Sequence, residues 1–495
     1  MTYRKTHGRR GFRIWLTLLT IGIWAGLMGY LLRDRFLEAS KTFTPSFNPI
    51  AAETDDWFLI RIGGAYAGFG RSRQFPREDR WTLLDEVNVS LNIQGQIKPL
   101  RIVNEAEVDV NFRLIGFRMK VSSGVIGFEQ KGRMEGRELV LDVPAFKGGG
   151  TIRLKVAERP VMNRSLGLPV PLTGVQVNDK FRIPIFDPLD GNKWDAEIRV
   201  LEKATVEISG KKLEAWRVRA TYRTVELTMW IDGKGRLLKG MMPLGITVIR
   251  SDKDEIVREM KMSKSLPDLA TISSVPLEGF LPDTPDLSLV RLQVSGDSTL
   301  LIPTDNARQI MKGFELTITK ESLPTATYRL PCTDPMMEQH LASSRFIRSD
   351  DPTVREKARE IVGTEQDPVK AASLINKWVY TNLRKIPTPT VPDAYSVLMT
   401  RQGDCNEHAV LAVSLARAVG LPARMVVGLV YNEKSYFYHA WVNYWAGDRW
   451  FTGDPLMNQM PVAPTHIALF YGDVEKHLNV ISYLGRIKLK VIEAK

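Results

Sequence analysis

The sequence predicts an α+β protein with an N-terminal single transmembrane helix, an antiparallel β domain, a small β module and a C-terminal domain of helices and strands. Three observations lead to this fold class. Residues 14–32 carry no charge, and the dominant pattern of residues 54–265 is an apolar–polar alternation of period two. After residue 350 the apolar period changes to that of helices.

Composition limits the function classes. The 495 residues are 44% hydrophobic and 25% charged, which is typical of a folded globular protein with several domains. Two cysteines exclude a disulfide scaffold and a cysteine-rich zinc array. The net charge of +12 raises nucleic acid as a partner, but no dense basic tract follows the first thirteen residues. We therefore expect no nucleic-acid partner.

The apolar segment at residues 14–32 predicts a membrane span. As a helix it would cover roughly 28 Å, about the thickness of the bilayer hydrocarbon. Residues 1–13 form a basic tail, which the positive-inside rule places in the cytosol. We expect a signal anchor in the cytoplasmic (inner) membrane, with most of the chain periplasmic or extracellular. A cleaved signal peptide is the alternative, but the segment is long and no A-x-A site follows it.

Residues 54–265 predict an antiparallel β-sheet domain. Alternating segments separated by turn residues are typical of half-buried strands, and the clearest are residues 87–93, 108–114, 117–121, 216–222 and 225–231. No cluster of ionisable residues there has catalytic spacing, so the domain receives no predicted role. Four prolines mark residues 266–288 as a linker, and short alternating runs predict a small β module at residues 289–345.

The C-terminal domain, residues 350–495, contains the candidate chemistry. A helix is expected to begin at Asp367, an N-cap residue followed by Pro368 at the first helical position. A second helix is expected after Asp404, because Glu407 follows three residues later in a capping-box pattern and Gly420 ends the apolar run. Cys405 would lie in its first turn, where the helix dipole lowers a thiol pKa and favours the nucleophilic thiolate. A buried structural cysteine is the alternative.

Two further segments give Cys405 possible partners. Residues 439–445 and 449–455 resemble strands separated by a turn. A hairpin centred near residues 446 and 447 would place His439 directly opposite Asp454. A carboxylate in that position fixes the imidazole tautomer and stabilises the imidazolium that forms when the histidine takes a thiol proton. Helix-borne Cys, strand-borne His and strand-borne Asp form a papain-type arrangement for nucleophilic acyl transfer.

The same segments resemble a known family. The runs GDCNEHAVLAVSLARAVGLPARMVVGLVY, YHAWVNYW and RWFTGDPLMNQMPVAPTHIAL are similar to the transglutaminase-like (papain-like) superfamily of bacterial exported proteins. The similarity covers about residues 367–469. It implies that Cys405 is the nucleophile, His439 the base and acid, and Asp454 the orienting carboxylate. The superfamily includes cross-linking enzymes, peptidases, amidases and inactive members, so the resemblance implies a chemistry rather than a substrate.

Three other residues have a structural and a functional interpretation. His408 lies one turn after Cys405 and could tune its thiolate, although a hydrogen bond to a neighbouring loop is the commoner role. His466 matches the family pattern without a spacing argument for catalysis. Cys332 lies in a segment with the composition of a loop and is expected to be a free thiol.

Competing chemistries are disfavoured. A metal site could draw on Cys405, His408, His439 and Asp454, but the tight ligand pairs of zinc sites do not occur, so we predict no metal. A G-x-S-x-G elbow is absent, which argues against a serine hydrolase. Coenzyme A is a cytosolic metabolite, and no nucleotide-binding glycine motif occurs, so no cofactor is expected.

The sequence therefore predicts a membrane-anchored extracytoplasmic thiol enzyme. It would form a Cys405 thioester on an amide of a protein, a peptide or a cell-wall peptide, and resolve it with an amine or with water. The aromatic residues around His439 slightly favour amine transfer over hydrolysis. The alternatives are a cysteine peptidase or amidase, and a non-catalytic membrane-tethered binding or scaffold protein.

Overall fold

The protein is mostly β, with strands making up 52% and helices 19%. The predicted α+β class is wrong, because the C-terminal half adds a large sheet of its own to that of the N-terminal half. The computed structural model describes residues 53–123, 126–143, 150–156, 159–160, 175–186, 193–222, 225–262, 265–282, 287–296, 302–304, 308–387, 393–473, 483 and 486–495. Within them, no helix is both long and apolar enough to cross a membrane. The predicted span at residues 14–32 lies outside these residues, so the transmembrane part of the fold class is unsupported.

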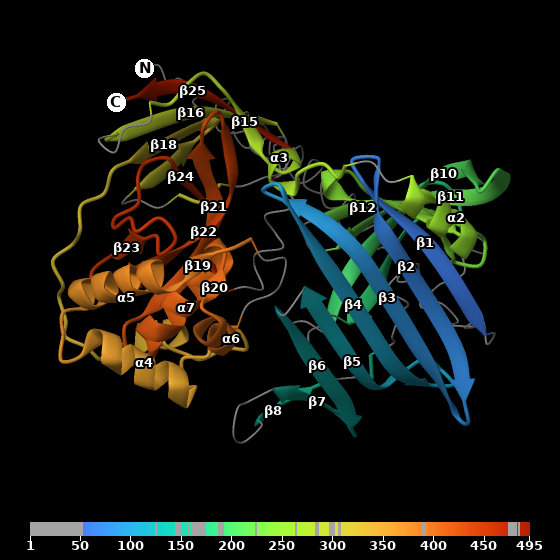
Figure 1. Ribbon diagram of the computed structural model, residues 1–495, viewed down its shortest axis with the longest axis horizontal. Helices are drawn as coiled ribbons and strands as arrows, with labels where there is room; N and C mark the ends of the chain where they lie inside the picture. Colours follow the sequence, from blue (N-terminus) through green and yellow to red (C-terminus); the bar gives the residue numbers. More distant parts are fainter. Residues whose placement is uncertain are drawn as a thin grey trace, which may run out of the picture.

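The N-terminal half forms one antiparallel sheet of fourteen strands, ordered β8-β7-β6-β5-β4-β3-β2-β1-β14-β13-β12-β11-β10-β9 (Figure 1). Most neighbouring strands are consecutive in the chain, and the β1–β14 pair joins the two runs. The strands are β1 (Thr54–Ile62), β2 (Ala65–Arg77), β3 (Arg80–Ile93), β4 (Gln96–Asp109), β5 (Leu114–Ser123), β6 (Ile126–Glu135), β7 (Glu138–Val143), β8 (Gly150–Lys155), β9 (Lys180–Phe186), β10 (Lys193–Ile208), β11 (Lys211–Tyr222), β12 (Val225–Ile231), β13 (Leu237–Met241) and β14 (Ile246–Ser251).

The predicted alternation agrees with these strands in all but one place. The segment predicted as one strand at residues 108–114 is a turn between two strands, because β4 ends at Asp109 and Phe112 has a positive φ of 58°. The loop is closed by Asp109, whose carboxylate accepts the backbone N–H groups of Asn111 and Arg113. Such local hydrogen bonding by aspartate competes with the strand ladder and favours turns.

A short connecting segment links the two halves. The 3₁₀ helix η1 (Pro243–Gly245) precedes β14, and helix α2 (Lys253–Lys261) follows it. Next come α3 (Leu269–Ile272) and β15 (Val275–Glu278), which lie inside the segment expected to be a linker. β15 pairs with strands of the second sheet, so residues 266–288 are structured where the chain is described.

The second sheet has the order β17-β18-β16-β25-β15-β22-β21-β24, with β23 paired to β22. Strands β16 to β18 fall in the expected small β module at residues 289–345 but belong to this larger sheet. The strands are β16 (Leu289–Gly296), β17 (Gln309–Lys312), β18 (Glu315–Thr319), β21 (Ala423–Asn432), β22 (Ser435–Trp445), β23 (Trp450–Gly453), β24 (His466–Gly472) and β25 (Ile487–Ala494). A separate short pair consists of β19 (Arg384–Lys385) and β20 (Gln402–Gly403).

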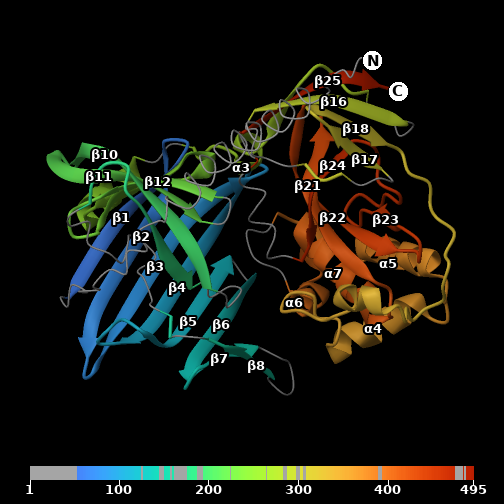
Figure 2. The same cartoon turned by 180° about the vertical axis from the view of Figure 1, so that it is seen from behind.

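Helices cover one face of the second sheet, as both ribbon views show (Figures 1 and 2). They are η2 (Pro335–His340), α4 (Pro352–Val362), α5 (Pro368–Asn382), α6 (Ala394–Thr400) and α7 (Cys405–Ala418). Helix α5 begins as predicted, because the Asp367 carboxylate accepts the N–H groups of Val369 and Lys370. Its buried stripe packs with α7 and with the inner faces of β21 and β22 in a single core.

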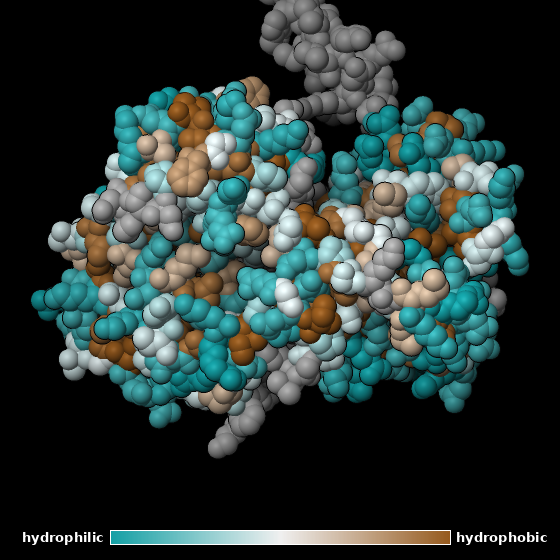
Figure 3. Space-filling model, turned by 45° about the horizontal axis from the view of Figure 1, so that its top comes forward, coloured by the Kyte–Doolittle hydropathy of each residue, from teal (hydrophilic) through white to brown (hydrophobic). Residues whose placement is uncertain are grey.

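The outer surface carries no single large apolar face in the view of Figure 3. Hydrophilic residues dominate there, and the hydrophobic ones are dispersed among them. Dispersed apolar side chains are normal for a folded protein surface. This view therefore offers no apolar docking face.

Candidate active site

Cys405 is the first residue of α7, and its position follows from the residues around it. Asp404 is the N-cap and Glu407 completes the predicted capping box, since the Asp404 N–H donates to Glu407 Oε2 at 2.8 Å. Gly403 allows this approach, because a Cβ at that position would lie 2.2 Å from the Glu407 Cβ. At the other end Gly420 has a φ of 79° and follows the end of the helix as predicted.

His439 lies on β22 and Asp454 directly follows β23. The His439 Nε2 and Asp454 Oδ2 are 2.7 Å apart, and both side chains are buried. The predicted register is wrong by two residues: Val442 pairs with Gly453, which would place Trp441 opposite position 454 if the ladder continued. A shift of two residues keeps a side chain on the same face of a strand, so the contact survives.

The Asp454 carboxylate is fully satisfied. Its Oδ1 accepts the backbone N–H groups of Leu456 and Met457 at 2.8 and 2.9 Å. The Asn376 side chain of α5 donates to its backbone carbonyl oxygen. Burial alone would raise the pKa of Asp454, but His439 and His466 hold that pKa well below its usual range. Asp454 is therefore an ionised acceptor, and the nitrogen of His439 that faces it carries a proton.

His466 is a member of this cluster that spacing did not reveal. Its Nε2 lies 3.2 Å from Asp454 Oδ2, the same oxygen that His439 contacts. It comes from β24, which pairs with β21, whereas β21 pairs with β22. Burial lowers the pKa of His466 to about 4, so the ring is neutral at pH 7 and donates its Nε2–H to Asp454. The one sequence signal was the PTHIAL segment.

The electrostatics of Cys405 differ from the sequence expectation. Burial raises the pKa of the Cys405 thiol well above its ordinary value, and Asp404 raises it further. A hydrogen bond from the backbone of Ala440, the residue after His439, lowers it in part. Desolvation outweighs the helix dipole here, so the resting sulfur is a thiol that needs a base. The Ala440 contact places the sulfur beside the strand that carries the base.

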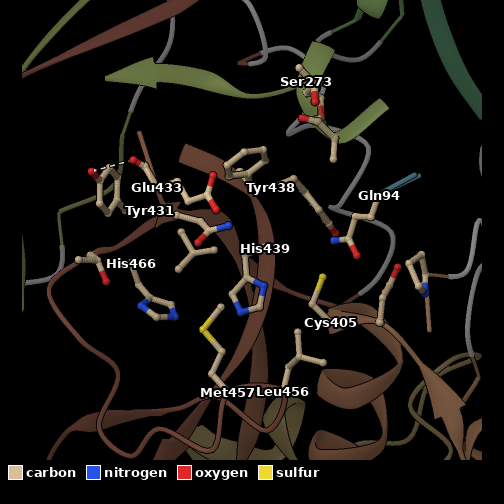
Figure 4. A pocket seen from close by; sticks show the side chains of 18 of the residues that line it. Gln94, Ser273, Cys405, Tyr431, Glu433, Tyr438, His439, Leu456, Met457 and His466 are labelled. Carbon is tan, nitrogen blue, oxygen red and sulfur yellow. Dashed lines mark hydrogen bonds between the residues drawn. The ribbon is translucent and has the colours of Figure 1, made fainter. Parts of the chain in front are cut away.

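Both groups face one large pocket. The cavity has a volume of about 1260 Å³ and is lined by Cys405, His439 and His466, among others. Figure 4 shows the Cys405 sulfur and the His439 ring projecting into it. The Tyr438 hydroxyl donates to Asn406 Oδ1 at 2.6 Å and thereby holds β22 against the start of α7. An amide carbonyl bound in this pocket can reach the Cys405 sulfur, and the His439 ring is available there to accept a proton.

The other two predicted residues lie apart from this chemistry. His408 is buried in the core, where its Nδ1 lies 2.6 Å from the Asp404 carbonyl oxygen, and it does not line the pocket. Cys332 is a free, buried cysteine, and Cys405 is also free. Neither cysteine is therefore blocked by a disulfide.

A metal would require a different ligand set from the one considered above. The ligand atoms of His439, Asp454 and His466 lie within 4.8 Å of one another. All three side chains are buried, and both rings already bond one carboxylate oxygen. A cation bound there would displace both hydrogen bonds. The arrangement fits a hydrogen-bonded network better than a metal centre.

The site is a Cys–His–Asp constellation of the kind used for nucleophilic acyl transfer. Comparison with known families agrees: residues 355–455 match the transglutaminase-like superfamily, so the chain contains a transglutaminase-like domain. Cys405, His439 and Asp454 all lie inside the matched residues. His466 lies outside the matched residues, about ten residues after their end.

Two proteins of uncharacterized function show similarity in sequence. One, from Haemophilus influenzae, is 31% identical over 98 residues, which are 19% of this chain and 26% of that protein. The chain thus matches about a quarter of that relative's length. The other, ML0607 from Mycobacterium leprae, is 24% identical over 203 residues, which are 36% of this chain and 72% of that protein.

Two solved structures are similar over part of the chain. A candidate cysteine protease from Cytophaga hutchinsonii has a TM-score of 0.29 at 16% identity, covering 45% of this chain and 83% of that one. A candidate protease from Parabacteroides distasonis has a TM-score of 0.21 at 11% identity, covering 76% of this chain and 63% of that one.

Proposed function

We propose that the protein is a thiol enzyme that forms a Cys405 thioester on an amide of a protein or peptide. The observation that carries this proposal is that His439, which is hydrogen-bonded to the buried Asp454, lines the same pocket as Cys405 at the start of α7. A scaffold protein would not require a buried imidazole–carboxylate pair next to a thiol, because burying ionisable groups is costly unless they are paired.

The hydrogen bond between His439 and Asp454 supports a path for each proton. Asp454 accepts from His439 Nε2, so the Nδ1 of that ring is the basic nitrogen. Nδ1 takes the thiol proton as the sulfur attacks the amide carbonyl carbon and a C–S bond forms. The backbone N–H of Cys405, in the first turn of α7, is an oxyanion donor, since N–H groups there have no partner within the helix. The C–N bond then breaks, and the His439 imidazolium gives its proton to the leaving amine.

Resolution of the thioester defines the reaction class. Water gives a carboxylic acid, and a primary amine gives a new amide; in both cases the nucleophile loses a proton to His439 and the thiol is regenerated. Half-buried Phe437 and Tyr438 line the pocket, and apolar walls keep water from an acyl intermediate. This favours transfer to an amine over hydrolysis.

The substrate is expected outside the cytosol, with cell-wall peptide as one candidate. This location is inferred from the charge distribution of residues 1–32. A reporter that is active only outside the cytosol, fused after Lys495, should be active. Activity of a cytosol-only reporter in its place would contradict the location.

Mass spectrometry of a glutamine-containing peptide tests the reaction. The full-length protein is incubated with the peptide, with and without a primary amine. Amine incorporation supports transfer, ammonia release alone indicates an amidase, and backbone cleavage indicates a peptidase. The Cys405→Ala variant should lower any of these rates by roughly 10³-fold or more, whereas Cys332→Ala, which removes the other buried thiol, should keep them. Equal activity of both variants would refute the thioester mechanism.

A further inference from the structure

The active-site pocket is not made by the transglutaminase-like domain alone. One wall comes from the first half of the molecule, through the β3–β4 turn at Ile93 and Gln94 and through residues of α3 such as Leu269 and Ala270. Other lining residues, among them Cys405 and His439, belong to the region that matches the family. The fourteen-stranded sheet, which has no role in the chemistry above, thus contributes to the site.

Gln94 is the polar side chain at the tip of this wall. It is exposed, with φ 52°, and Gly95 follows with φ 76°, so the two residues form a tight turn between paired strands. Figure 4 shows its carboxamide directed into the pocket, on the side where Cys405 lies. A carboxamide offers two donors and one acceptor, which suits the N–H and C=O groups of an extended peptide.

The turn is held in place by Asp268. One carboxylate oxygen of Asp268 accepts the Ala270 N–H and caps α3, and the other accepts the Gly95 N–H at 2.7 Å. The Asn92 side chain donates to the Leu266 carbonyl oxygen at 2.9 Å. Two of these hydrogen bonds, Gly95 to Asp268 and Asn92 to Leu266, therefore fix the turn to the start of α3.

This wall is also connected to the catalytic strand. β15 follows α3 directly, and its Val275 pairs with Tyr436 of β22, three residues before His439. Leu244, which lines the pocket, packs against the core of the second sheet. These contacts keep the backbone of the turn, from which Gln94 extends, in place relative to the nucleophile.

The charges of the lining indicate what the pocket excludes. The lining contains the carboxylates of Asp268, Asp404 and Glu433, and within the described part of the chain no lysine or arginine lines it. The whole chain, in contrast, carries a net charge of +12. An acidic side chain next to the scissile amide would meet like charge in a partly desolvated space, which opposes binding.

We propose that the β3–β4 turn and α3 are a substrate-binding wall, and that Gln94 hydrogen-bonds the backbone of an extended, non-acidic peptide whose amide reaches Cys405. This inference rests on the proposed function for its substrate class. It makes Gln94 a substrate-binding residue and gives the first sheet a role in binding the peptide.

Binding and turnover are measured separately to test the wall. Binding uses the full-length Cys405→Ala protein and a fluorescein-labelled ten-residue peptide with a central glutamine flanked by alanine and lysine. Adding Gln94→Ala should weaken binding about 3- to 10-fold, the range for one hydrogen bond. Gln96→Ala, on the same hairpin but outside the pocket lining, should leave binding unchanged. A peptide with glutamate in place of lysine should bind more weakly.

The cap supplies a second, independent variant. Asp268→Ala should weaken peptide binding because the turn loses its anchor, whereas Asp252→Ala removes the matching N-cap of α2 away from the pocket and should not. In proteins with Cys405 intact, Gln94→Ala should raise KM for the peptide, with kcat and the rate of Cys405 alkylation by iodoacetamide unchanged. Unchanged peptide binding in both Gln94→Ala and Asp268→Ala would overturn the wall, as would an effect on kcat alone. Loss of turnover in the parent protein with binding retained would refute only the enzymatic function.

Discussion

The two halves contain ion pairs of very different exposure. In the first sheet, Arg133 pairs with Glu135 and Asp142, and its side chain is 51% exposed. In the second half, the Arg417 side chain is 3% exposed and pairs with Asp473, while Asp454 is fully buried between two histidines. Exposed pairs contribute little to stability, whereas buried groups persist only when they are fully bonded. In the second half, the buried charged groups include the carboxylate of the candidate site, Asp454, to which both histidines are hydrogen-bonded.

The largest expected effect comes from the carboxylate of the cluster. In Asp454→Asn, if the amide oxygen keeps the Leu456 and Met457 N–H groups, the amide nitrogen faces His439 and the ring must accept there. The proton of His439 then moves to Nδ1, which can no longer take the thiol proton. We expect kcat to fall by roughly 10²- to 10⁴-fold.

Turnover of the glutamine-containing peptide measures this loss. Asp367→Asn is the matched control, because asparagine also caps a helix and Asp367 lies at the start of α5. A decrease of less than about threefold for Asp454→Asn would mean that the carboxylate does not set the tautomer.

The second effect is a pH dependence of stability from His466. Its pKa is about 4 in the folded protein, whereas an unperturbed histidine has a pKa of 6.5, so between these values the unfolded chain takes up a proton and the folded chain does not. Unfolding is therefore favoured as the pH falls from 6.5 to 4, by up to roughly 3 kcal/mol. His466→Gln should remove this part of the slope.

Urea unfolding at several pH values between 7 and 4 gives the comparison. His340→Gln changes a histidine outside the cluster and should retain the wild-type slope. Identical slopes for the wild type and His466→Gln would show that His466 is not kept neutral by burial.

The smallest expected effect is that of removing an exposed arginine, and it is compared with removal of a buried one. Arg133→Ala should leave both the free energy of unfolding and turnover almost unchanged, because its ion pairs are exposed to solvent. Arg417→Ala is the buried counterpart: it removes the partner of Asp473 and of the Ala342 and Ala423 carbonyl oxygens, and should cost about 3 kcal/mol or more. Thermal or urea unfolding of both variants measures the difference. Equal losses of unfolding free energy in Arg133→Ala and Arg417→Ala would show that burial does not make the Arg417 pair more important for stability.

Local features were predictable from the sequence because neighbouring residues create them. The capping box at Asp404 and Glu407, the helix start at Asp367 and the alternation of β11 and β12 depend on contacts within a few residues. The first sheet is also largely a chain of consecutive hairpins, so pattern and pairing coincide there. Cys405, His439 and Asp454 could be proposed from the sequence for the same reason, since each lies in a short segment with a recognisable pattern.

Only the tertiary structure decided the rest, because it depends on strand pairing over long separations and on burial. The register of the β22–β23 hairpin differs by two residues from the symmetric estimate, since its loop is longer than assumed. His466 reaches Asp454 through β24 and β21, and Gln94 reaches the pocket from a turn more than 300 residues before Cys405. The direction of the Cys405 pKa was likewise set by desolvation, which arises from the packed fold and has no local pattern in the sequence.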